Sequence, residues 1–169
     1  MKAYLDIETT GLSPHYADIT VVGISFGDVR DNDVIQLVGK DIKADALVKA
    51  LKSATTICTY NGSRFDLRFI HQKLGVDLMA DFEHHDLMHD CWANGLYGGL
   101  KAVEQTLGIQ RKLTGVDGLQ AVRLWWAYVR RRDENALQTL LDYNKEDVLN
   151  LKHLERKLSL SRRSSGAGL

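Results

Sequence analysis

The sequence predicts an α/β domain: a mixed five-stranded sheet, with three antiparallel strands followed by parallel strands, flanked by helices. Three observations support this prediction. The first half of the chain contains short β-branched runs separated by turn residues. A helical stretch between two of the later runs forms a strand–helix–strand unit after the antiparallel strands. The second half is dominated by apolar residues at helical spacing.

The first three strands lie close together in sequence and are expected to form an antiparallel meander. A polar turn over residues 28–33 joins the second to the third. The fifth has the weakest pattern of the set. The expected strands cover residues 2–7, 19–27, 33–38, 55–60 and 84–88.

Apolar residues at helical spacing predict five helices. Ser63 is expected to cap the second helix, with Gly75 as its stop, and Gly108 ends the third. The helices are expected at residues 43–53, 64–74, 99–107, 118–132 and 135–158. The composition changes at Ser159, so we expect one domain over residues 1–158 and a disordered tail over residues 159–169.

Composition is that of an ordinary globular domain, with 44% apolar and 26% charged residues among 169. No apolar run reaches the roughly 18 residues of a membrane span, and the sequence begins directly with a strand rather than a signal peptide. Cys58 and Cys91 are the only cysteines, which gives no disulfide framework. We therefore expect a cytoplasmic protein with no membrane partner.

The formal net charge is zero, so overall charge does not indicate a nucleic-acid binder. The densest basic run is residues 130–132, and further basic residues flank the acidic blocks described below. Each alone is expected on a solvated surface, whereas together they would line a track for phosphates. The flanking residues are Arg64, Arg68, Lys73, Lys101, Arg111 and Lys112.

Four carboxylates in three distant blocks are the candidate site. Asp6 and Glu8 are two apart on a strand and share one face, Asp66 opens a helix, and Asp147 follows Tyr143 by four residues on the last helix. Taken singly, these blocks suggest a solvated strand end, an acid stabilised by a helix dipole, and an incidental pair. Converging carboxylates repel one another, and divalent cations relieve that repulsion. The set predicts a site for Mg²⁺ or Mn²⁺, which prefer oxygen ligands.

Two other features invite alternatives. His85 and His89 would bind zinc if residues 84–91 were helical, completed by Asp86, Asp90 or Cys91, but the chain has no second ligand pair. Asp86 is expected to cap a following helix instead. The aromatic residues of the helix over 118–132 would stack bases, although their spacing favours core packing with one exposed; they are Trp125, Trp126 and Tyr128.

The order and spacing of the acidic blocks resemble the DnaQ-like 3′–5′ exonucleases of the ribonuclease H-like superfamily. Asp6 and Glu8 match the first motif of that family, Asp66 in Asn-Gly-x-x-Phe-Asp matches the second, and Asp147 matches the third. Tyr143 in Tyr-x-x-x-Asp is similar to the tyrosine (DEDDy) subclass. The block Leu-Lys-Ala-Val-Glu at residues 100–104 is similar to YprB-type domains.

The resemblance implies two-metal hydrolysis of phosphodiester bonds at the 3′ end of single-stranded DNA or RNA. It implies that Asp6 bridges both ions, that Glu8 and Asp147 hold the ion carrying the nucleophile, and that Asp66 helps to hold the second. Tyr143 would orient the attacking water, since a phenol is a poor base at pH 7.

The resemblance also implies contacts to the terminal nucleotide from the Thr9 backbone, an apolar wedge at Leu12 and the amide of Asn61. Core packing explains Leu12 equally well, and Asn-Gly alone predicts a turn at Asn61. Lys101, at the start of a helix, would meet a phosphate, but a surface position is the simpler explanation for it. Four residues of the last helix are expected on its exposed face: Asp142, Lys145, Glu146 and Asn150. The alternative functions are a non-catalytic nucleic-acid-binding or partner-docking module and a ribonuclease H-type endonuclease. Work within a repair or processing assembly stays open.

Overall fold

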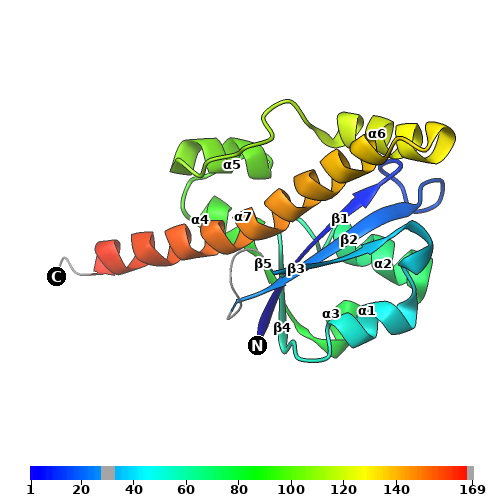
Figure 1. The fold of residues 1–169 in the computed structure, drawn as a ribbon. Helices are drawn as coiled ribbons and strands as arrows, with labels where there is room; N and C mark the ends of the chain where they lie inside the picture. Colours follow the sequence, from blue (N-terminus) through cyan, green and yellow to red (C-terminus); the bar gives the residue numbers. More distant parts are fainter. Residues whose placement is uncertain (28–32, 167–169) are drawn as a thin grey trace.

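A single five-stranded mixed sheet organises the chain (Figure 1). The computed structural model describes residues 1–27 and 33–166. The strands run in the order β3-β2-β1-β4-β5, with β1, β2 and β3 antiparallel and β1, β4 and β5 parallel. Their bounds are β1 Lys2–Thr9, β2 Ile19–Phe26, β3 Val34–Val38, β4 Thr56–Thr59 and β5 Glu83–Asp86. The predicted fold class is confirmed, while most of the polar turn expected at 28–33 lies outside the described residues.

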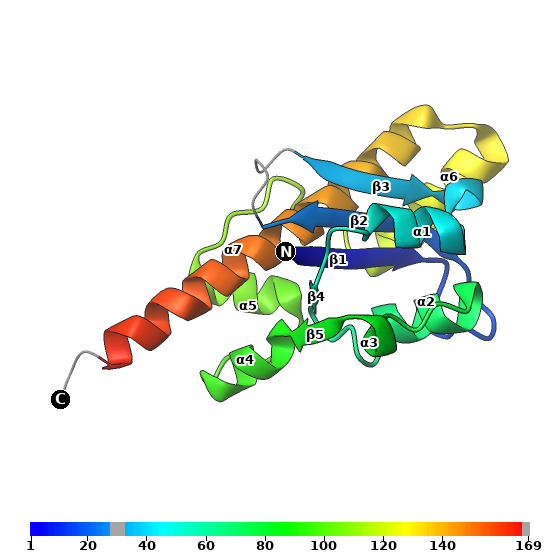
Figure 2. The same ribbon diagram turned by 90° about the horizontal axis from the view of Figure 1, so that it is seen from below.

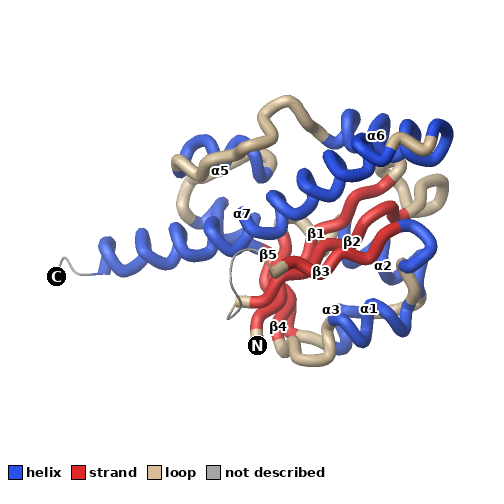
Figure 3. Tube along the Cα trace, viewed as in Figure 1, coloured by secondary structure: helices blue, strands red, loops and turns tan. Residues whose placement is uncertain are grey.

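Helices cover both faces of the sheet (Figures 1 and 2), and Figure 3 shows the strands between the helical layers. The short helices α1, α2 and α3 pack on one face, and α5, α6 and α7 pack on the other. The long helix α7 crosses the sheet and extends beyond it. The bounds are η1 Gly39–Asp41, α1 Ala44–Ala50, α2 Asp66–Leu74, α3 Leu78–Asp81, α4 Leu87–Ala93, α5 Leu100–Leu107, α6 Gly118–Arg131 and α7 Glu134–Gly166.

Alternation along β1 separates an apolar face from an acidic one. Leu5 and Ile7 belong to the core packed by α1, α2 and α3. Tyr4 belongs to the opposite core, formed with α7. Because side chains alternate along a strand, Asp6 and Glu8 leave β1 on the same side as Tyr4, facing α7. The strand therefore places both carboxylates between the sheet and the longest helix.

Gly23 on β2 permits the close approach of α7. It pairs with Asp6 across the sheet. A Cβ at Gly23 would lie 2.2 Å from the Asn144 Oδ1 atom and 2.8 Å from Val148 Cγ2. Glycine is the only residue without a Cβ atom. At Gly23, α7 can therefore pack directly against β2, next to Asp6. This contact determines where along the sheet α7 places its own acidic residue, Asp147.

Several local predictions are confirmed, and others are wrong. Gly75 and Gly108 end α2 and α5 in left-handed conformations, with φ of 69° and 68°. Ser63 is not an N-cap: α2 begins at Asp66, preceded by Phe65 without a side-chain cap. The helices α3 and α4 are too short for their periodicity to be recognised in the sequence.

The change in composition at Ser159 does not end the last helix. α7 continues to Gly166, in contrast to the disordered tail expected from this point. Residues 159–165 contain no proline or glycine, so nothing in them interrupts the backbone hydrogen bonds of the helix. Among the described residues, no helix combines the length and the apolar character needed to cross a membrane.

Candidate metal and catalytic site

Three of the four predicted carboxylates meet between β1 and α7. Oxygen atoms of Asp6, Glu8 and Asp147 all lie within 4.8 Å of one another. Glu8 and Asp147 are each 7% exposed, which excludes a solvated strand end. Asn144, one turn before Asp147, donates its amide to the Asp6 carboxylate at 3.1 Å. The fold therefore brings together residues separated by about 140 positions in the sequence.

Asp66 approaches the same group from the first turn of α2, as expected. It is 4% exposed. Its Oδ1 atom accepts a hydrogen bond from the backbone N–H of Ile7 at 3.0 Å, between the two acids of β1. Asp66 raises the pKa values of Asp6 and Glu8 through its charge. All four predicted acids thus belong to one electrostatic unit.

The loop that carries Asp66 is held by Asp86 at the end of β5. The Asp86 carboxylate accepts hydrogen bonds from the Asn61 N–H at 2.7 Å and from the Ser63 hydroxyl at 3.0 Å. Asn61 has a left-handed φ of 62°. A Cβ at Gly62 would lie 2.2 Å from the Thr59 hydroxyl, so the turn needs glycine. Asp86 is a positioning residue whose role in this loop was not predicted from the sequence.

Burial and mutual repulsion disfavour ionisation of these acids. Burial, followed by the neighbouring carboxylates, raises the pKa values of Asp6 and Glu8 well above their usual range. Burial raises the pKa of Asp66 to about 7, against two opposing backbone hydrogen bonds. Burial also raises the pKa of Asp147, although Arg111 opposes this. Bound cations would oppose these shifts, because they favour the ionised carboxylates.

Arg111 is a mostly buried cation beside the cluster, with its side chain 10% exposed. Its guanidinium bonds to the Asp147 carboxylate and forms a two-point ion pair with Glu104, one contact of which is 2.9 Å. Glu104 is only 1% exposed, so this arginine compensates a carboxylate with almost no access to water. Arg111 was predicted as one of several solvated basic residues, and that prediction is wrong. It ties α5 to α7 and faces the candidate site.

Tyr143 and Lys101 form the wall beside these acids. Tyr143 is 6% exposed, and burial, followed by the Asp147 charge, raises its pKa. The Lys101 ammonium lies 4.7 Å from the centre of the Tyr143 ring and donates to the Val116 carbonyl. Lys101 is thus partly buried, rather than fully exposed as a free surface lysine would be. Its charge lowers the pKa of Glu8, so it contributes to the site.

The three predicted substrate contacts lie on loops around the cluster. Thr9 ends β1 and donates its hydroxyl to the Gly11 carbonyl at 2.7 Å. Leu12 is 89% exposed, which excludes core packing and leaves its side chain available to a ligand. Asn61 occupies the turn before Asp66, with its N–H held by Asp86. The structure contains no ligand, so these contacts stay predictions.

The donor set fits hard divalent cations. Carboxylate oxygens converge here without sulfur or imidazole ligands, as Mg²⁺ and Mn²⁺ prefer. Asp6, Glu8 and Asp147 are close enough to share an ion. Buried carboxylates held this close are unfavourable without positive charge. Asp66 extends the same acidic surface, which is consistent with more than one ion.

The zinc hypothesis for residues 84–91 fails on geometry. His85 lies in β5 and His89 in α4, so they do not share a helix face. His89 packs against the Trp92 ring, with 5.5 Å between centroids. Asp86 caps α4 by accepting the Met88 N–H at 3.2 Å, which confirms that prediction.

The exposure of two helices differs in detail from expectation. On α6, Trp125 packs in a core and Trp126 is 38% exposed, as predicted, with the Arg130 guanidinium 4.9 Å from its ring. On α7, Asn150 is 4% exposed rather than on the surface. Glu146 accepts backbone N–H groups of the segment after Arg111, so it also has a structural contact.

Comparisons with known proteins show the family of this chain. Residues 3–159 match the family profile described as the RNase_H superfamily. The uncharacterized protein YprB of Bacillus subtilis (strain 168) is 29% identical over 164 residues, covering 88% of this chain and 39% of YprB. The chain therefore spans well under half the length of this curated relative.

Two solved structures illustrate the similarity of fold. NrnC of Brucella melitensis has a TM-score of 0.66 at 25% identity, covering 99% of this chain and 76% of NrnC. The family B DNA polymerase of the hyperthermophilic archaeon Pyrobaculum calidifontis has a TM-score of 0.70 at 16% identity, covering 93% of this chain and 24% of the polymerase. Structures of the same NrnC with bound Mg²⁺ and with pGG have TM-scores of 0.54 and 0.52 at 23% and 24% identity; both cover 99% of this chain and 88% of NrnC.

Proposed function

Because this chain belongs to the ribonuclease H superfamily, we propose that it is a metal-dependent 3′–5′ exonuclease of the tyrosine (DEDDy) subclass. Its substrate would be the 3′ end of single-stranded DNA or RNA. The observation that carries the proposal is the convergence of Asp6, Glu8 and Asp147, within 4.8 Å, beside buried Tyr143. A module without chemistry gains nothing from burying mutually repelling carboxylates.

The acids of β1 and α7 would hold the cations. Asp6 lies with Glu8 and Asp147 in the cluster, and burial, followed by the charges of the other three carboxylates, raises its pKa. Glu8 and Asp147 would complete one ion site and Asp66 a second. Bound Mg²⁺ or Mn²⁺ would supply a lowered water pKa and neutralise charge on the phosphate. The protein supplies a rigid arrangement, since Asn144 and the Ile7 N–H each fix one carboxylate.

Tyr143 would orient the attacking water through its hydroxyl. Burial raises the pKa of this phenol, so it keeps its proton and cannot act as a base at neutral pH. The Lys101 ammonium and the Arg111 guanidinium both lie near its ring, 4.7 Å and 6.0 Å from the centroid. They place positive charge where the phosphate would enter. We assign orientation rather than proton abstraction to Tyr143.

The loop residues would contact the terminal nucleotide. Leu12, almost fully exposed next to the acidic strand, would pack against the last base. The Thr9 backbone and Asn61 would meet its sugar or phosphate. The chain contains equal numbers of acidic and basic residues, 22 each. Because it has no net positive charge to attract a long phosphate backbone, it would bind a polymer mainly near the 3′ end.

A gel assay tests the proposal. Single-stranded DNA and RNA, each labelled at the 5′ end, are incubated with Mg²⁺, Mn²⁺ or EDTA, and pGG serves as a short substrate. We expect a one-nucleotide ladder that requires metal and is lost in Asp147→Ala. Asp142→Ala, an exposed acid of the same helix, is the matched control and retains cleavage.

Other outcomes separate the alternatives. Cleavage of a circular single strand would identify a ribonuclease H-type endonuclease instead. Metal-dependent thermal stabilisation without cleavage of any substrate would identify a binding or docking module, because a ligand that binds the folded state stabilises it by mass action. Cleavage that persists in Asp147→Ala would refute the assigned site.

A further inference from the structure

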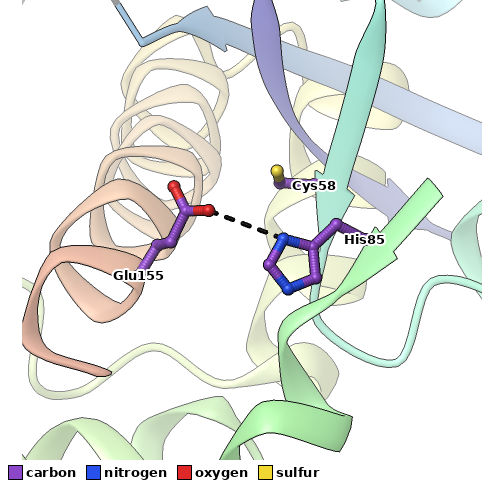
Figure 4. A group of neighbouring side chains, drawn as sticks. All are labelled: Cys58, His85 and Glu155. Carbon is purple, nitrogen blue, oxygen red and sulfur yellow. Dashed lines mark ion pairs between the residues drawn. The ribbon is translucent and has the colours of Figure 1, made fainter. Parts of the chain in front are cut away.

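A second group of metal-ligating side chains lies between α7 and the β4–β5 edge of the sheet. It consists of Cys58 on β4, His85 on β5 and Glu155 on α7 (Figure 4). One ligand atom from each lies within 4.8 Å of the others. Three elements distant in sequence thus present sulfur, nitrogen and oxygen to one point. Neither the acidic site nor the proposed reaction uses these residues.

The hydrogen bonding of His85 leaves one ring nitrogen directed at this point. Its Nε2 atom lies 2.7 Å from the Asp90 carboxylate, which can only accept, so Nε2 carries a hydrogen. Its Nδ1 atom faces Glu155 Oε1 at 3.5 Å (Figure 4). Carboxylates commonly orient metal-binding histidines through the opposite nitrogen in this way. Asp90 therefore fixes His85 with Nδ1 toward Cys58 and Glu155.

The 3.5 Å separation suits a shared cation better than a direct ion pair. A charged N–H···O contact measures roughly 2.7–2.9 Å, as on the Asp90 side of the ring. Zinc bonds of about 2.0–2.2 Å to nitrogen and oxygen place tetrahedral ligands roughly 3.3–3.6 Å apart. His85 Nδ1 and Glu155 Oε1 already have that spacing. Cys58 Sγ lies within 4.8 Å of both atoms.

We infer that Cys58, His85 and Glu155 form a second metal site, for a zinc-class transition ion, that fastens α7 to the β4–β5 edge of the sheet. The thiolate and imidazole ligands select Zn²⁺ over Mg²⁺, so the two sites take different metals. His85 is 34% exposed and Glu155 14%, which gives the ion a path from solvent. Water would fill the fourth position.

The Lys2 ammonium and the Cys58 thiol proton must be displaced when the ion binds. The Lys2 ammonium lies 2.5 Å from Glu155 Oε1, and the Tyr4 hydroxyl donates to Oε2 at 2.5 Å. Lys2 is 47% exposed and can turn into solvent, whereas Tyr4 contacts the other carboxylate oxygen and can stay. Burial, followed by the Glu155 charge, raises the pKa of Cys58 to about 12, so binding must displace its thiol proton. Affinity should therefore increase with pH.

The test is a Co²⁺ titration of the chelator-treated 169-residue protein, followed by near-ultraviolet absorption. Cobalt bound to a thiolate gives a charge-transfer band that carboxylate-bound cobalt does not give. We expect one band-forming Co²⁺ per chain, displaced by Zn²⁺. Cys58→Ser should abolish the band, while Cys91→Ser, which alters the other buried free cysteine, should retain it.

Asp90→Asn provides a graded test. Losing the carboxylate that orients His85 should weaken cobalt binding 10–100-fold without removing the band. All variants are compared by circular dichroism and by Mg²⁺-dependent thermal shift, which report the fold and the acidic site independently. Absence of the band in folded wild-type protein, or its persistence in Cys58→Ser, would overturn the inference. Either result would show that the cluster is a hydrogen-bond network centred on Glu155.

Discussion

Asp66→Asn should stabilise the metal-free protein at neutral and alkaline pH. Asp66 is 4% exposed and accepts the Ile7 N–H at 3.0 Å, and an asparagine oxygen can accept the same hydrogen bond. The substitution therefore removes a charge while keeping the acceptor. Because the pKa of Asp66 is raised in the fold, ionisation opposes folding, and its removal favours the native state.

The magnitude follows from the pKa difference. Burial raises the pKa from 3.8 to about 7, and about 1.4 kcal/mol per pKa unit gives about 4 kcal/mol. Between these two values the unfolded chain has lost this proton and the native state keeps it. Stability of the metal-free wild type should thus fall as pH rises from about 4 to about 7 and then level off. The stability of Asp66→Asn should not show this decrease between about pH 4 and pH 7.

Thermal unfolding in EDTA at pH 5 and pH 8 measures the effect. For a chain of this size, about 4 kcal/mol corresponds to roughly 8–16 °C, expected as a higher Tm for Asp66→Asn at pH 8. Asp142→Asn, an exposed acid that accepts from Gln138, is the control and should change stability by less than about 0.5 kcal/mol. With Mn²⁺ the wild type should gain more than the variant. A lower Tm for Asp66→Asn at pH 8 in EDTA would refute this reasoning.

Three further substitutions test separate contacts. Tyr143→Phe should lower kcat roughly 10²-fold, less than Asp147→Ala, because the phenol orients water without holding cations; equal losses in single-turnover assays would contradict these roles. Arg111→Gln should cost about 3–5 kcal/mol in urea unfolding, since buried Glu104 is left without its cation, and a change under about 1 kcal/mol would show that the pair is dispensable. Gly23→Ala should destabilise by about 1–3 kcal/mol and weaken Mn²⁺ binding, because the new Cβ would overlap Asn144; unchanged Mn²⁺ affinity would show that α7 moves without disturbing the acids.

The motif residues were predictable because their spacing carries geometric meaning. Asp6 and Glu8 two apart on a strand, and Tyr143 and Asp147 four apart on a helix, each must share a face. Their order along the chain then indicates the fold; the structure confirms the sheet and brings three of the four acids, Asp6, Glu8 and Asp147, together. The catalytic roles stay predictions until activity is measured.

The residues that support these acids were missed for a physical reason. Arg111 and Lys101 lie in segments whose local pattern is that of solvated surface, and only the packing of α5 against α7 buries them. Asn144 had a usable signal, because its helical spacing from Leu140 and Val148 places it on the packed face. The second cluster could not be recognised in the sequence, because its residues lie far apart on three elements: Cys58, His85 and Glu155.

The most direct test of the account is a count of bound Mn²⁺ by electron paramagnetic resonance in the Cys58→Ser background, which removes the second proposed site. We predict two Mn²⁺ per chain, released by EDTA. Asp147→Asn should weaken binding at least tenfold, whereas Asp142→Asn should not alter it. Failure of the folded protein to bind Mn²⁺, or equal binding by Asp147→Asn, would contradict the assignment of these carboxylates as the metal site.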